Sequence, residues 1–221
     1  MFQPLRLEVM NRFTAVGQHF RASRRFKGTP AQVARGLVFV QIYATYEYTV
    51  NTTLQVGIDA MMAHKKPFQD LRPSVLALFL ESRFQSLKDS PAKNEWDCRL
   101  ALLEQACSKD PALVGNGTMP VNGTHYRYEQ LQLIFRVLGI RRRPAKKWQH
   151  LHRINEIVDH RNAIAHGRDT AENVGRQYTR RDIDHRLRQS KSLCLYLIST
   201  VEEYCTDPAK FCKRPAMLGL P

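Results

Sequence analysis

The chain lacks the long hydrophobic run that a membrane-spanning helix requires. Its apolar runs, such as Leu37–Val40, are short, whereas a helix needs roughly 20 apolar residues to cross a bilayer. Charged residues already interrupt Met1–Glu8, so we expect no secretory signal peptide. These absences predict a cytoplasmic protein without a membrane anchor.

Cysteines are few, and their spacing forms no recognisable framework. Their number, five, is odd, and no Cys-x-x-Cys pair occurs. We therefore expect neither a disulfide framework nor a zinc site, and a reducing compartment fits best.

Acidic residues are too few to balance the basic ones. The chain has 20 Asp and Glu against 34 Lys and Arg, which gives a net charge of +14. Such an excess favours polyanions, most simply nucleic acid. A local basic cluster is a candidate grip for an RNA backbone, and a solvated linker is the open alternative. The cluster consists of Arg141, Arg142, Arg143, Lys146 and Lys147.

Apolar residues recur with the period of an α-helix. The clearest stripe advances in steps of three and four through Phe39, Tyr43, Tyr46, Val50, Leu54, Ile58 and Met61. Further helices are expected over residues 5–25, after Pro73, and over residues 96–107, 128–138, 148–161 and 179–204. We therefore predict an all-α bundle of about six to seven helices. Its expected parts are an N-terminal helix (1–28), a main helical domain (29–205) and an irregular tail (206–221).

Turn-forming residues predict where the helices end. Residues 115–123 are rich in Gly and Asn, which predicts a loop with room for a small hairpin. Gly139 and Gly167 are expected to follow helix ends. The polar stretch 168–177 is expected to be a loop, and Thr179 with Asp182 has the spacing of a capping box.

Polar residues gather where the helix of residues 148–161 is expected to close, in the segment Arg161–His166. Asn162 and His166 are four residues apart and therefore share a helix face. The long side chain of Arg161 can curl towards that face. An imidazole, a guanidinium and an amide are thus expected together at a helix C-terminus.

This set of groups can cleave RNA without a metal ion or cofactor. A neutral His166 can take the proton of a ribose 2′-OH, which then attacks the phosphorus. Arg161 can hold the phosphate and stabilise the charge of the transition state, while Asn162 can orient either His166 or the phosphate. The products would be a 2′,3′-cyclic phosphate and a 5′-hydroxyl. Other histidines suggest no metal site, because no carboxylate or thiolate completes a familiar ligand spacing.

The spacing alone is not specific, because Arg180 and His185 share it. Those two lie beside Asp182 and Asp184, where ion pairing is the simpler explanation. The corresponding alternative for Arg161 is an ion pair with Asp159 or Glu156. His166 would then only cap its helix.

Arg161-Asn162 with His166, closing the penultimate helix, resembles the Arg-x(4–6)-His signature of the HEPN superfamily. Residues 127–140 resemble a stretch found upstream in RiboL-PSP-type HEPN families, and the helix containing Tyr46-Glu47-Tyr48 resembles their early helix. The resemblance covers most of residues 30–205, but only the Arg–His signature is specific.

The resemblance implies a helical homodimer in which two Arg–His motifs face each other in a composite site. It also implies an RNA-cleaving toxin of a toxin–antitoxin or antiphage system, with a cognate antitoxin as a candidate partner. In some members a polar residue of an earlier helix assists, and Glu47 is the candidate here. The alternative for Glu47 is a structural pairing with an arginine. Arg168 stands where toxins controlled by tyrosine modification carry Tyr, so that control is not expected.

Two other functions stay open at this point. One is a non-catalytic HEPN module that binds RNA or nucleotide, or scaffolds a complex. The other is an unrelated helical DNA-binding regulator, although the sequence has no compact helix-turn-helix signature. The complete Arg-Asn-His set favours the ribonuclease, because a binding module has less need of the histidine.

Overall fold

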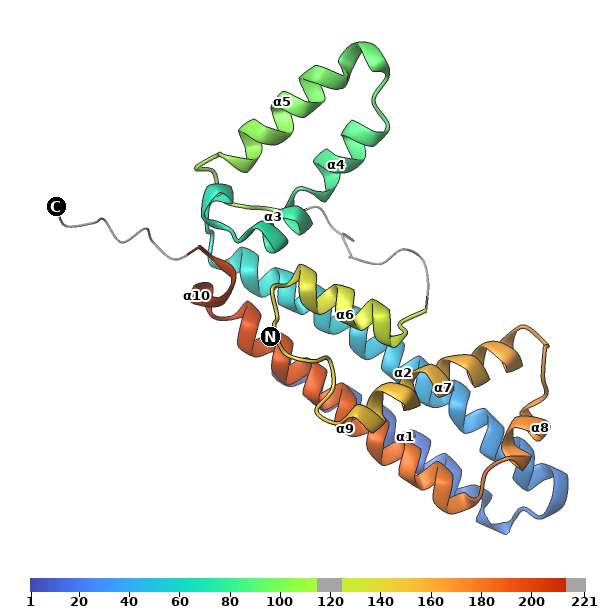
Figure 1. The fold of residues 1–221 in the computed structure, drawn as a ribbon. Coiled ribbons are helices and arrows are strands. Elements are labelled where there is room, and N and C mark those ends of the chain that lie inside the picture. The colour runs from blue at the N-terminus through green and yellow to red at the C-terminus, as the bar shows by residue number, and fades with distance from the viewer. Residues whose placement is uncertain (115–124, 214–221) are drawn as a thin grey trace. The chain divides into compact units, whose positions relative to one another are not determined.

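The computed structural model describes residues 1–114 and 125–213. Within these ranges the chain is helical, with two isolated β-bridges and no strand, which confirms the predicted all-α class. The described residues form ten α-helices where about six to seven were expected, because several of the helices are short (Figure 1). They are α1 (Phe2–Ala22), α2 (Gly28–Ala63), α3 (Pro73–Phe79), α4 (Glu81–Lys88), α5 (Glu95–Ala106), α6 (Tyr128–Val137), α7 (Trp148–Ala165), α8 (Ala171–Arg176), α9 (Arg180–Cys205) and α10 (Pro208–Phe211).

The chain divides into two compact units, and helices α2, α6 and α9 contribute to both. The first unit comprises Met1–Leu54, Gly123–Gln132 and Arg143–Thr200. The second comprises Gln55–Asn122, Leu133–Arg142 and Val201–Pro221. None of the helices in the described part of the chain is long and apolar enough to cross a membrane.

The first unit is built on long helices that each bury one apolar face. In α1 the buried residues recur every three or four positions, as Phe2, Leu5, Val9, Phe13, Val16 and Phe20. The stripe predicted for α2 is buried as expected from Phe39 to Leu54, and its last members, Ile58 and Met61, are buried in the second unit. Helices α1 and α9 lie side by side (Figure 1), and Arg6 of α1 donates a hydrogen bond of 2.8 Å to Ser199 of α9.

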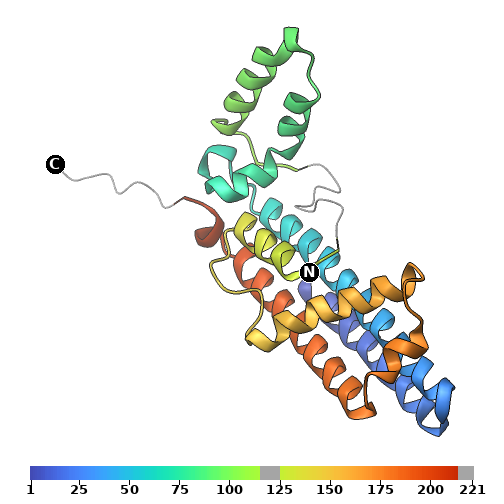
Figure 2. The ribbon, with the colours of Figure 1, turned by 45° about the vertical axis from the view of Figure 1, so that its right-hand side comes forward.

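In the second unit, α4 and α5 form a helical hairpin (Figure 2). The short helix α10 forms where an irregular tail was expected. The Asp207 carboxylate caps α10 by accepting a hydrogen bond from the Ala209 amide, and Pro208 occupies its first turn. Arg72 then donates to the carbonyls of Ala209 and Cys212, which fixes the segment. The expected loop at residues 115–123 lies outside the described residues. The last part of the expected tail, residues 214–221, also lies outside them.

Helix α8 forms within residues 168–177, for which a loop was predicted. The Thr170 hydroxyl accepts a hydrogen bond from the Asn173 amide and so caps the helix. The helix then packs backbone to backbone against α2. A Cβ added at Gly175 would lie 1.8 Å from the Gln32 carbonyl oxygen, and one at Gly36 would lie 1.9 Å from the Ala171 carbonyl oxygen. Because glycines make this contact, the segment has no apolar period that would have predicted a helix.

We predict that Gly36→Ala lowers the free energy of unfolding by about 1–3 kcal/mol or more, because backbone atoms must move to admit the methyl group. Gly17→Ala is the matched control, since Gly17 lies inside α1 and its added Cβ would meet only the Arg21 guanidinium at 3.7 Å. That control is expected to gain about 0.5–1 kcal/mol from its higher helix propensity. Urea unfolding of both variants measures the difference, and equal effects would contradict a close contact between α2 and α8.

Candidate active site

The C-terminal turn of α7 presents the Arg161–His166 segment. The helix ends at Ala165, and Gly167 follows with a φ of 67°, the left-handed conformation that glycine adopts without strain. The His166 amide still donates to the Asn162 carbonyl at 3.0 Å. The backbone of His166 is therefore held by the last helical turn while its side chain is exposed to solvent.

The Arg161 guanidinium is held in place by two contacts. It lies over the ring of Tyr43 on α2, with 4.6 Å between Cζ and the ring centroid. One of its Nη atoms donates a hydrogen bond of 3.0 Å to Oδ1 of Asn162. The Asn162 side chain is 5% exposed, so this bond forms largely away from water. The structure therefore assigns Asn162 to Arg161, where the sequence left open whether it orients the histidine or the phosphate.

The acids that were alternative partners for Arg161 bind other arginines. Asp159 forms an ion pair of 2.5 Å with Arg127. Glu156 pairs with Arg186 at 2.8 Å and with Arg153 at 3.1 Å. Within residues 1–114 and 125–213, Arg161 forms no ion pair with a carboxylate. The structural explanation of Arg161 as an ion-pair partner is therefore wrong for the part of the chain described.

A second group of polar side chains surrounds the Tyr43 hydroxyl. This hydroxyl donates a hydrogen bond of 3.0 Å to Oε1 of Glu47, and it lies 3.1 Å from Nδ1 of His125. Glu47 forms no ion pair with an arginine among the residues described, so its predicted structural alternative is not observed. The structure brings Glu47 to Tyr43, and through Tyr43 to Arg161.

The sequence pattern did not indicate His125, and it predicted Tyr43 as a core residue. Tyr43 is indeed 1% exposed, but its hydroxyl is the centre of a polar cluster. The signal for His125 was a histidine close before α6, two residues from Arg127. The pattern could not reveal that the fold brings this histidine to α2.

Burial and charge set the protonation states in this cluster. Burial lowers the pKa of His125, and the positive charges of Arg161, Arg127 and His166 lower it further, against the opposing charge of Glu47. Burial, and then the charge of Glu47, raise the pKa of Tyr43. At neutral pH we therefore expect an uncharged His125 imidazole and a protonated Tyr43 hydroxyl.

The predicted RNA-binding cluster is divided between the two units. Its side chains are exposed, as expected of either a binding surface or a solvated linker. Arg142 is paired with Glu203 through two hydrogen bonds of 2.6 and 2.9 Å, so it is partly neutralised. Lys146 lies 5.8 Å from the centroid of the Tyr196 ring. Arg141 and Arg142 belong to the second unit, and Arg143, Lys146 and Lys147 belong to the first.

Arg180 belongs to the competing pair with the same spacing, Arg180 and His185, and its contacts are structural. Arg180 donates a hydrogen bond to the Phe20 carbonyl and lies over the Phe20 ring at 4.2 Å. Its partner is therefore not the acid expected from the sequence. Asp182 instead completes the predicted capping box, because its Oδ2 accepts from the Thr179 amide at 2.9 Å.

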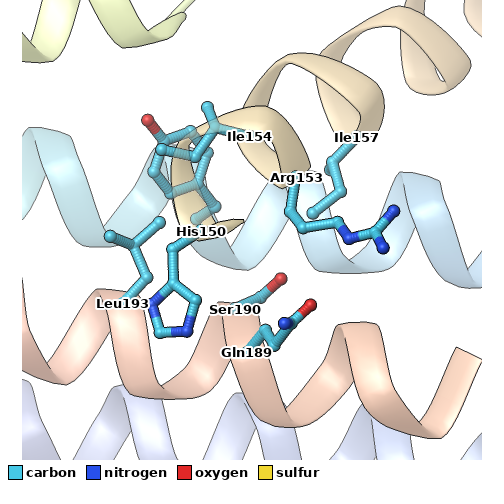
Figure 3. Close-up of a pocket in the computed structure, with 8 residues that line it drawn as sticks. His150, Arg153, Ile154, Ile157, Gln189, Ser190 and Leu193 are labelled. Carbon is cyan, nitrogen blue, oxygen red and sulfur yellow. The ribbon is translucent and has the colours of Figure 1, made fainter. Parts of the chain in front are cut away.

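Two further features of the described residues bear on ligand binding. No three His, Cys, Asp or Glu side chains there lie close enough together to hold a metal ion. Figure 3 shows a cavity between α7 and α9 lined by His150, Gln189 and Ser190 among others. Its volume is about 10 Å³, which suits at most one water molecule. The cavity is therefore too small for a nucleotide.

A second polar cluster forms around His160, a half-buried residue directly before Arg161. His160 lies 2.6 Å from the Tyr178 hydroxyl through Nε2, and that hydroxyl donates to Glu156 at 3.0 Å. The His160 ring packs edge-on against Phe39, with 4.8 Å between centroids. This group repeats the residue types of the Tyr43 cluster in a more enclosed setting.

One comparison with known proteins identifies a family. The model of the family described as MAE_28990-like HEPN matches residues 16–209. No curated protein and no solved structure matches the chain significantly.

We predict that the protein loses stability as the pH falls below about 6.5, the ordinary pKa of histidine. Burial lowers the pKa of His160, and Arg186 lowers it further, while Glu156, Asp159 and Asp169 oppose the shift. A histidine whose pKa is lowered by folding contributes stability that is full above its unfolded pKa and is lost as the pH falls through the folded one.

His160→Gln keeps a donor near the Tyr178 hydroxyl but cannot be protonated. Urea unfolding midpoints at about pH 7.5 and about pH 5.5, a window chosen to lie above the titration of ordinary carboxylates, are expected to differ less for this variant than for the wild type. The remaining pH dependence comes from His125 and His150, whose pKa values are lowered in the same direction. If the urea midpoint of the variant changed with pH as much as that of the wild type, the predicted contribution of His160 to the pH dependence would be contradicted.

Proposed function

We propose that this chain, which belongs to the MAE_28990-like HEPN family, is a metal-independent endoribonuclease. The observation that carries the proposal is the state of Arg161. Its guanidinium is fixed by Tyr43 and Asn162, yet no carboxylate among the described residues neutralises it. A cation that is positioned but not neutralised suits a phosphate that passes through a more highly charged transition state.

The remaining chemistry requires two proton transfers. The ribose 2′-oxygen loses its proton and bonds to phosphorus, while the bond from phosphorus to the 5′-oxygen breaks and that oxygen gains a proton. The products are a 2′,3′-cyclic phosphate and a 5′-hydroxyl. His166 is exposed at the end of α7, five residues after Arg161, where it can provide one of the two transfers.

The charge of the chain supports RNA as the substrate. A net charge of +14 attracts a polyanion and makes its binding sensitive to salt. Membership of the HEPN family agrees with an RNA-related module. The biological role we propose is that of a toxin or antiphage effector acting on cellular RNA, with an antitoxin as its regulator, and the active form is a homodimer in which the two sites face each other.

Cleavage of total RNA in the presence of EDTA tests the mechanism. We expect the wild type to cleave, because no step requires a metal ion. His166→Ala is expected to lose about 10²–10⁴-fold in rate, and Arg161→Ala about 10²–10³-fold. His185→Ala is the matched control, since His185 shares the spacing but lies away from the cluster, and it should cleave as the wild type does.

The ends of the products complete this test. Cyclic phosphate ends that only active variants produce would support attack by the 2′-oxygen. Equal cleavage by all variants would rule out this site. RNA binding without cleavage by any variant would favour the non-catalytic HEPN module instead.

A growth experiment tests the proposed biological role. Expression of the wild type is expected to arrest the host, because an unregulated ribonuclease destroys RNA that growth requires. His166→Ala should relieve the arrest at equal protein level, and His185→Ala should not. Growth unaffected by active wild-type enzyme would contradict the toxin role while leaving the ribonuclease activity intact.

Sedimentation of the purified protein tests the homodimer. We expect twice the mass of the chain, which is 25.6 kDa, and a specific activity that falls on dilution as protomers separate. A protein that is active and only monomeric would exclude a composite site.

A further inference from the structure

We propose that His125 is a second catalytic histidine, which Tyr43 and Glu47 position as the general base for the ribose 2′-OH. This inference rests on the proposed ribonuclease function. It leaves His166 as the general acid for the 5′-oxygen, in place of the base role that the sequence suggested for it.

The hydrogen bonds of Tyr43 define which nitrogen of His125 carries the proton. A phenolic hydroxyl has one hydrogen, and Tyr43 donates it to the Glu47 carboxylate at 3.0 Å. The contact of 3.1 Å between the hydroxyl and His125 Nδ1 must therefore be a hydrogen bond donated by the imidazole. Neutral His125 then has its proton on Nδ1, and its Nε2 has a lone pair that can accept the 2′-OH proton.

The Tyr43 ring also fixes the base relative to the phosphate-binding group. Its face lies under the Arg161 guanidinium at 4.6 Å, and its hydroxyl binds His125. A phosphate held by Arg161 is thus anchored on the same side chain as the base. Such a shared support is what the alignment of a 2′-OH, a phosphorus atom and a base requires.

Electrostatics keep His125 in the form that a base needs. Arg161, Arg127 and His166 add their positive charges to the effect of burial in lowering the pKa of His125, and the negative charge of Glu47 limits the decrease. Glu47 thereby keeps the imidazole basic enough to act. No hydrogen bond to Nε2 of His125 is formed by the residues described.

The proton transfers of the reaction then balance. The 2′-OH proton moves to Nε2 of His125 as the 2′-oxygen attacks phosphorus. Protonated His166 gives its proton to the departing 5′-oxygen. Both histidines are restored by exchange with solvent, which the exposure of His166 permits.

The His160 cluster shows why the same residue types need not be catalytic. His160 uses Nε2 for its contact with Tyr178, and its ring is packed on Phe39. Its acid, Glu156, is paired with Arg186 and Arg153. Tyr178→Phe is therefore a matched structural control for Tyr43→Phe.

A pair of substrates separates the roles of the two histidines. One is an oligoribonucleotide that the wild type cleaves at one mapped bond. The other has sulfur in place of the bridging 5′-oxygen at that bond, so that the leaving thiolate needs no proton. Removing the acid should slow cleavage of the oxygen substrate only, whereas removing the base should slow cleavage of both.

We expect His125→Asn to lose at least about 100-fold in single-turnover rate on both substrates. An Asn amide reproduces the Nδ1–H donor to Tyr43 but has no base at the position of Nε2, so the fold should be preserved. His166→Ala should lose a similar factor on the oxygen substrate and recover to within about tenfold of the wild type on the sulfur substrate. Thermal unfolding of each variant checks its folding.

The positioning residues are tested by the pH dependence of the rate. Glu47→Gln still accepts the Tyr43 hydrogen bond but lacks the charge that raises the pKa of His125. The acidic limb of its rate profile should therefore move to lower pH, a shift that a merely structural role would not cause. Tyr43→Phe should reduce the rate while keeping an aromatic ring under Arg161, and Tyr178→Phe should change stability without moving the limb.

Three results would overturn the inference while leaving the ribonuclease proposal intact. They are wild-type rates for His125→Asn on both substrates, failure of the sulfur substrate to rescue His166→Ala, and an unmoved acidic limb in Glu47→Gln. A wild type that cleaves no RNA, or an Arg161→Ala variant that cleaves normally, would instead overturn the ribonuclease proposal itself.

Discussion

The packing of the Arg161 guanidinium on the Tyr43 ring is the contact on which the candidate site depends. It joins the last turns of α7 to the middle of α2, and the buried amide of Asn162 supports it from the α7 side. Tyr43 belongs to the buried apolar stripe of α2, so its ring is fixed by core packing. The guanidinium that packs on this ring is therefore restricted as well. Without this contact, only the hydrogen bond to Asn162 would hold the Arg161 guanidinium, and nothing would join it to the cluster of Tyr43, Glu47 and His125.

Long periodic segments and terminal signals of helices were predictable from the sequence. The α2 stripe is buried, Thr179 and Asp182 cap α9, and Gly139 and Gly167 adopt positive φ. These features are local, so a few neighbouring residues encode them. Helix α8 was not predictable in the same way, because its contact with α2 depends on the absence of a side chain at Gly175, and a glycine in a polar segment usually indicates a turn.

The residues of the site also differ in whether local sequence or only tertiary contacts could reveal them. Arg161, Asn162 and His166 were found together because they lie within six consecutive residues at the end of one helix. Glu47 was found because it interrupts an apolar stripe. The role of Tyr43 was hidden, since periodicity reports whether a ring is buried and does not report what its hydroxyl binds. His125 could not be placed at all, because only the tertiary fold brings the segment before α6 to Tyr43 on α2.

A scarcity of acids means that an arginine without an ion pair is ordinary in this chain, with 34 basic and 20 acidic residues. Such a residue by itself therefore indicates nothing about function. Exposed cations such as Arg141 and Lys147 must lose side-chain entropy before they can hold a phosphate in one place. Arg161 has already lost that freedom, because neutral groups fix it without cancelling its charge. This combination of immobility and uncompensated charge, more than the Arg–His spacing, distinguishes a site that can stabilise a transition state from a basic surface that can only attract RNA.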